Sequence, residues 1–199
     1  MVARPFRQQI DEGILDRAAA LFARHGFEHT SLQAVADAVG LSKAGLLHHF
    51  PSKDALHEAV LALADALGRR VLDQVTTMPL GPERDVRAVE ALIDVALAHP
   101  GVVALLLAPA TQGDVDAPAP AKEGPGAAAL EAFGVDPETA APERLVRVIG
   151  ALTALAVLSL AAHQKNQTTA WRPLVVATCI DALGSRRPGV PSRSDQAEA

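Results

Sequence analysis

The chain has 199 residues, of which 49% are hydrophobic, and carries a formal net charge of −5. This balance is typical of a globular protein with an apolar core and argues against a disordered or fibrous chain. A single cysteine, Cys179, excludes an internal disulfide framework and a CxxC-type metal site, which favours a reducing cytoplasm.

Hydrophobic periodicity predicts helices and no convincing strand, so the expected fold class is all-α. A first helix over residues 8–25 ends at Gly26, a residue suited to a helix C-terminus. The longest apolar run, 148–162, falls short of the roughly 20 residues that span a bilayer. We therefore expect a buried helix there and no membrane partner.

Residues 30–39 predict a short amphipathic helix. Thr30 and Gln33 have the spacing of a capping box at its start, and Gly40 is expected to end it. Its apolar stripe falls at i, i+3, i+4 and i+7 and comprises Leu32, Val35, Ala36 and Val39.

A second short helix is predicted directly after this glycine turn. Ser42 is a suitable N-cap, and Leu46 and Phe50 are expected to point inward. At 100° per residue, Ala44 and His48 then point away from the core. Two short helices joined in this way are the sequence form of a helix-turn-helix, whose second helix reads a DNA groove.

The stretch 14–56 resembles the N-terminal DNA-binding domain of TetR-type transcriptional regulators. The resemblance rests on many fixed spacings, among them Gly26-Phe27, Thr30-Ser31, Gly40-Leu41-Ser42, His49-Phe50 and Ser52-Lys53. It covers about a quarter of the chain. The outward side of the second helix and the resemblance together give these expected DNA-binding residues: Ser31, Gln33, Ser42, Lys43, Ala44, Gly45, Leu47, His48, His49 and Lys53.

Leu47 departs from the resembling family, which usually has a tyrosine here that binds a backbone phosphate. The chain contains no tyrosine, so either His48 substitutes or that contact is absent. The alternative is that Leu47 is simply a core residue.

The rest of the chain predicts further helices and three parts. Residues 1–53 are expected to form the helix-turn-helix domain, 54–184 a helical ligand-binding and dimerisation domain, and 185–199 a disordered tail. The helices are expected over 53–76, 83–98, 100–108, a short segment before Gly134, 142–164 and 168–183, with a loop over 113–126.

A small-molecule effector is expected in the second domain, with His99, His163 and Trp171 as candidate ligand-binding residues. A lone histidine beside an apolar helix is more often a hydrogen-bonded structural residue. Aromatic residues are only 3% of the chain, which favours an aliphatic or weakly polar effector. No phosphate-binding loop, nucleophile elbow or paired metal-ligand spacing occurs, so no cofactor, no metal and no enzymatic activity are expected.

The resemblance implies a repressor that binds a near-palindromic operator in double-stranded DNA as a homodimer and is released by its effector. The apolar helix 142–164 and the last helix are expected to form the dimer interface. The alternative is a helical interaction module that has lost or weakened DNA binding.

Overall fold

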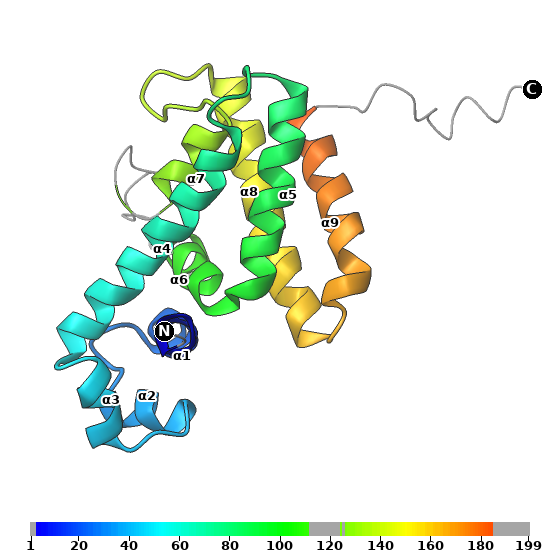
Figure 1. The fold of residues 1–199 in the computed structure, drawn as a ribbon. Coiled ribbons are helices and arrows are strands. Elements are labelled where there is room, and N and C mark those ends of the chain that lie inside the picture. Colours follow the sequence, from blue (N-terminus) through cyan, green and yellow to red (C-terminus); the bar gives the residue numbers. More distant parts are fainter. Residues whose placement is uncertain (1–2, 112–123, 125, 185–199) are drawn as a thin grey trace, which may run out of the picture.

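The chain folds into helices, and the described residues of this computed structural model, 3–111, 124 and 126–184, contain no strand. Helices α1 to α3 and the start of α4 form a small unit at one end, and the remaining helices pack above it (Figure 1). The helices are α1 (Ala3–His25), α2 (Leu32–Ala38), α3 (Lys43–His49), α4 (Lys53–Val75), α5 (Pro82–Ala98), α6 (Pro100–Thr111), α7 (Ala127–Ala132), α8 (Pro142–Gln164) and α9 (Thr168–Leu183).

The predicted fold class is confirmed, and most predicted boundaries lie within two residues of the observed ones. Two helices are longer than predicted: α1 begins at Ala3 and α6 continues to Thr111. The predicted loop over 113–126, apart from Gly124 and Gly126, and the predicted tail over 185–199 lie outside the described residues.

Two clusters of buried apolar side chains divide the chain, and the long helix α4 belongs to both. The first cluster lies under α1, α2 and α3 and continues along α4 as far as Leu67. The second joins the end of α4, from Val71 on, to α5, α7, α8 and α9. Because α4 is embedded in both clusters, it couples their positions. The predicted domain boundary after residue 53 lies at the start of this shared helix.

A second connection joins α1 to the first turn of α6. A Cβ added to Gly101 would overlap the main-chain carbonyl oxygen of Asp16, so the two backbones touch. The Asp16 carboxylate accepts a hydrogen bond from the Val102 N–H at 2.9 Å, which satisfies one of the free donors at the start of α6. The Val102 side chain is buried in the first cluster. The start of α6 is therefore part of the N-terminal unit.

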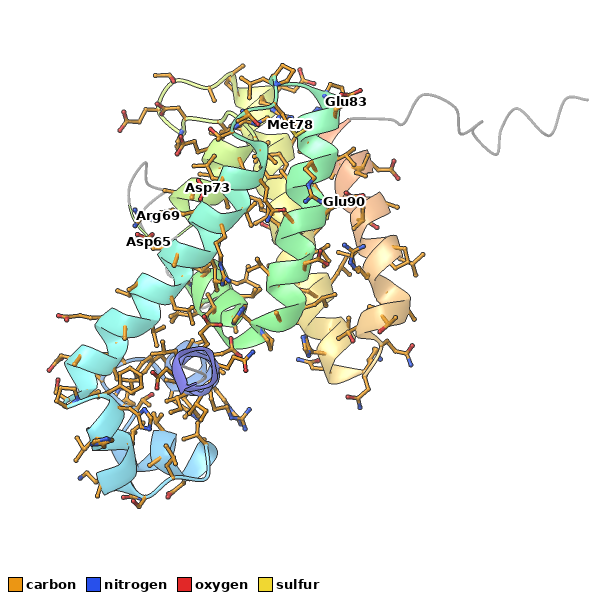
Figure 2. The ribbon with its side chains drawn as sticks, in the orientation of Figure 1. Asp65, Arg69, Asp73, Met78, Glu83 and Glu90 are labelled. Carbon is orange, nitrogen blue, oxygen red and sulfur yellow. The ribbon has the colours of Figure 1, made fainter. Side chains whose placement is uncertain are left out.

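Polar side chains fix the upper end of the molecule. Buried Arg84 donates to the carbonyl of Ala132 at the end of α7 and to that of Met78, which lies at the α4–α5 connection in Figure 2. Arg144 of α8 donates to both carboxylate oxygens of Asp85, at 2.7 and 2.9 Å. These bonds attach α7 and α8 to the start of α5.

Helix α8 is 23 residues long and, among the described residues, is the one helix that alone has the length and composition to cross a membrane. The length argument made from the run 148–162 was therefore wrong, because the helix extends beyond that run at both ends. Only 28% of its most apolar window is buried within the chain. One side of α8 packs on α5 and α9, and another is left uncovered.

We expect Gly101→Ala to lower the free energy of unfolding by about 1–3 kcal/mol, because the added methyl group forces α1 and α6 apart. Urea unfolding followed by circular dichroism measures the change. The matched control is Gly13→Ala in α1, where a Cβ meets nothing within 4 Å and a gain of about 0.5–1 kcal/mol is expected. Equal effects of the two substitutions would contradict the close contact.

We expect Asp16→Asn to stabilise the protein at neutral pH. Burial raises the pKa of Asp16 above its ordinary value, and the Val102 N–H and the charge of His99 only partly oppose this. A carboxyl group with a raised pKa in the folded state contributes stability at low pH and loses it as the pH rises through that pKa. Asparagine stays neutral and keeps an oxygen for Val102.

The variant Asp16→Asn should therefore exceed the wild type in free energy of unfolding at about pH 7, and this difference should shrink as the pH falls to about 4. Urea unfolding of both proteins across this range measures it. An advantage that grows towards acid pH would contradict the buried carboxylate.

Candidate nucleic-acid interface

The start of α2 is capped by Ser31. Its Oγ accepts the N–H of Ala34 at 3.1 Å. The predicted capping box of Thr30 and Gln33 was therefore wrong by one residue. Thr30 is buried and donates its hydroxyl proton to the Gly26 carbonyl at 2.8 Å, so it holds the preceding turn instead.

The turn between α2 and α3 follows the prediction. Gly40 has φ of +71°, a left-handed conformation that side chains other than glycine rarely adopt. The Leu41 N–H then reaches back to the Ala36 carbonyl at 2.9 Å and closes the helix end. Ser42 caps α3, with its Oγ accepting the Gly45 N–H at 3.0 Å.

Helix α3 has one buried side and one exposed side. Leu46 is fully buried and Phe50 nearly so, which fixes the helix on the first apolar cluster. Ala44 and His48 are exposed, as predicted from the 100° rotation per residue. Leu47 is 37% exposed, so the alternative that it is a core residue is excluded.

Two predicted DNA-binding residues are engaged inside the N-terminal unit. His49 lies half-buried between α3 and α1, with its Nδ1 2.7 Å from Asp11 Oδ1. Lys53 donates from Nζ to the carbonyls of Phe27 and Glu28 at 3.0 and 3.3 Å. Its ammonium also lies 4.2 Å from the centroid of the Phe27 ring. Sequence reasoning missed these roles because the partners lie 38 and 25 to 26 residues away.

The remaining candidates belong to the start of α2, the turn and α3, and all are at least partly exposed. Their surface, which we call the reading surface, combines an ammonium, an imidazole, hydroxyl and amide groups with small apolar side chains. Such groups bind phosphates and the edges of bases. Its exposed members are Ser31, Gln33, Ser42, Lys43, Ala44, Leu47 and His48, and Gly45 is partly exposed among them.

The three candidate ligand-binding residues lie in the second part of the chain. His163 Nε2 is 2.7 Å from the Leu97 carbonyl oxygen, the structural hydrogen bond that a lone histidine usually makes. His99 ends α5, and its charge acts on Asp16. Trp171 packs against the second apolar cluster. A role of these three in ligand binding stays a prediction.

Comparison with known proteins gives a consistent result for the N-terminal unit. The family described as bacterial regulatory proteins, tetR family, matches residues 14–60. The HTH-type transcriptional regulator RutR of Escherichia coli (strain K12) is 42% identical over 62 residues, 31% of this chain and 26% of RutR. The HTH-type transcriptional repressor KstR2 of Rhodococcus jostii (strain RHA1) is 40% identical over 58 residues, 28% of each chain.

These matches span about a quarter of the length of the curated relatives. The whole fold is similar to the crystal structure of a TetR-like transcriptional regulator from Rhodococcus sp. RHA1. The TM-score is 0.52 at 20% identity, with 94% of this chain and 100% of that one covered. Residues 14–60, which hold the helix-turn-helix unit, thus match the N-terminal domain of the tetR family of bacterial regulatory proteins.

Proposed function

We propose that the chain is a DNA-binding transcriptional regulator that binds a near-palindromic operator as a homodimer and is released by a small molecule. The observation that carries this proposal is the reading surface. Leu46 and Phe50 hold α3 on the core, and its opposite side presents Lys43, Ala44 and His48 to solvent. This is the arrangement of a recognition helix that lies in the major groove.

The contacts divide into two kinds. Lys43 in the first turn of α3 and the His48 imidazole bind phosphates or guanine edges, while the Ala44 methyl group and Leu47 contact thymine methyl groups. Lys53 uses two of the three donors of its ammonium on backbone carbonyls, and the third is available to a phosphate. The tyrosine hydroxyl common at the position of Leu47 in the family is absent.

We expect Lys43→Ala to weaken operator binding by about 1–3 kcal/mol if Lys43 reads a guanine, with relaxed specificity at one base pair. If Lys43 binds a phosphate, the salt dependence should fall by about one unit of slope. The probes are genomic DNA fragments selected by binding to the wild-type protein. Mobility-shift assays with these fragments across a series of salt concentrations measure both the affinity and its salt dependence. The control is Lys165→Ala, an exposed lysine after α8 that should change neither quantity.

The same assay separates the proposal from the alternative of an interaction module without DNA binding. Retardation that is specific and sensitive to salt supports the regulator. Failure of the wild type to retard any fragment at low salt would support the interaction module.

Dimerisation is supported by exposed stripes on α8 and α9. On α8, exposed Val146, Gly150, Thr153 and Val157 follow one another at intervals of three or four residues, and on α9 Leu174 is 64% exposed. A Cβ at Gly150 would meet nothing within 4 Å, so this position leaves room for a close approach. Two copies of α8 and α9 form a four-helix interface, which covers the apolar side that the single chain leaves open.

A two-fold dimer of this kind places two reading surfaces on one side of the molecule. Recognition helices related by such symmetry bind half-sites about one DNA turn, roughly 34 Å, apart or at a related spacing. The operator is therefore near-palindromic.

We expect Val157→Glu to convert the dimer into a monomer, because a carboxylate then replaces an apolar side chain of the exposed stripe. Sedimentation velocity at micromolar concentration measures the state. The control is Leu80→Glu, since Leu80 is equally apolar and 65% exposed but lies outside α8 and α9. A wild type that sediments only as a monomer would contradict the proposed interface.

Effector release is proposed to act through α4 and α6. Both helices connect the second apolar cluster to the N-terminal unit, so a ligand that shifts either one changes the spacing of the two reading surfaces. The size of the effect is limited by the difference in ligand affinity between the two states. An aliphatic or weakly polar effector suits the aliphatic second cluster, and His99, His163 and Trp171 remain its candidate contacts. A regulator of this kind acts in the cytoplasm, where the DNA is.

A further inference from the structure

Two neighbouring histidines at the end of α3 differ in their surroundings. His48 is exposed on the reading surface, whereas the side chain of His49 is only 20% exposed and its Nδ1 lies 2.7 Å from Asp11 Oδ1. The two rings are nearly perpendicular, at 81°. A carboxylate only accepts hydrogen bonds, so the Nδ1–H donates and Nε2 is the atom that a direct DNA contact would use.

Helix α3 depends on few contacts for its orientation. It has seven residues, and Leu46 is the one among them that is buried. Leu46 and Phe50 set which side of α3 faces the core, but apolar contacts are not directional and leave smaller rotations of α3 about its own axis open. The bond from His49 to Asp11 is directional and joins the last turn of α3 to a long helix.

The rotation of α3 about its own axis decides which of its side chains face the DNA. Each residue is 100° from the next, so a partial turn replaces Ala44 and His48 on the outward side by their neighbours. A contact that fixes this angle therefore acts on DNA binding without touching the DNA. Small misplacements of groups that recognise a partner are costly, because recognition needs rigid support.

We propose that His49 is a positioning residue, which through Asp11 fixes the rotation of α3 and so sets the reading surface. The proposal rests on the proposed DNA-binding function. It replaces the expectation from the family resemblance that His49 itself contacts DNA.

Two substitutions of His49 separate the two roles. The side-chain amide nitrogen of asparagine occupies about the place of Nδ1, whereas that of glutamine occupies about the place of Nε2. His49→Asn therefore keeps a donor for Asp11, and His49→Gln keeps a donor for a direct DNA contact instead. Asp11→Ala removes the acceptor and leaves the imidazole in place.

We expect operator affinity to fall about tenfold in His49→Gln and in Asp11→Ala, and to stay within about twofold of the wild type in His49→Asn. The double variant His49→Gln/Asp11→Ala should bind no more weakly than either single variant, because both remove the same contact. The salt dependence should keep its slope in all variants, since no phosphate contact is lost. Thermal unfolding of each variant gives its folded fraction at the assay temperature. The measured affinities are then corrected for this fraction.

The opposite pattern overturns the proposal. Retained affinity in His49→Gln, lost affinity in His49→Asn and no effect of Asp11→Ala would make His49 a direct DNA contact. A slope reduced by about 0.9 in His49→Asn would show that this contact is to a phosphate.

Hydrogen exchange on the free protein tests the same contact without DNA. Peptides covering residues 43–50 should lose protection in His49→Gln and Asp11→Ala and keep it in His49→Asn, while peptides covering 93–103 stay unchanged. If the wild type binds no DNA, the proposed function fails, and this exchange pattern still decides whether Asp11 holds α3. Unchanged protection in all three variants would overturn the proposal.

Discussion

The contact between α1 and the first turn of α6 is the constraint on which the arrangement of the chain depends. It requires glycine at position 101, because the Asp16 carbonyl leaves no room for a side chain. The Asp16 carboxylate then caps α6, and Val102 enters the apolar cluster of the N-terminal unit. A helix that belongs by sequence to the second part of the chain is thereby built into the first. Together with α4, it gives the N-terminal unit two attachments, and two attachments fix an orientation where one would leave a hinge.

The orientation of the reading surface depends on several contacts that hold α3 in place. The apolar cluster holds Leu46 and Phe50, the glycine turn at Gly40 sets the angle between α2 and α3, and Ser42 caps α3. A short helix gains little stability from its own hydrogen bonds, so nearly all of its order comes from these neighbours. Movement of α4 or α6 reaches the reading surface through the same contacts. The proposed release by a ligand therefore needs no connection other than these packed helices.

The exposed apolar surface of α8 has a different origin. Its residues are apolar nearly all round, yet only 28% of its most apolar window is buried within the chain. A surface of that kind is costly in water unless a partner covers it. In the proposed homodimer, a second copy of the chain covers this surface, and the two-fold symmetry would let two short α3 helices bind one longer operator. The proposed dimer thus accounts for both the apolar composition of α8 and the expected symmetry of the operator.

The sequence by itself determined the helices, the helix-turn-helix and the exposed side of α3, because these depend on periodicity, caps and turns that act within about five residues. It placed Ala44 and His48 outward and Ser42 at the start of α3, as the structure does. Only the tertiary structure decided that His49 and Lys53 turn towards the core and that Asp16 meets α6. Their partners lie between 25 and 86 residues away, and no local pattern records which distant segment a side chain will meet. The displaced cap at Ser31 shows the remaining limit, since serine and threonine are both suitable N-caps and burial of Thr30 decided between the two residues.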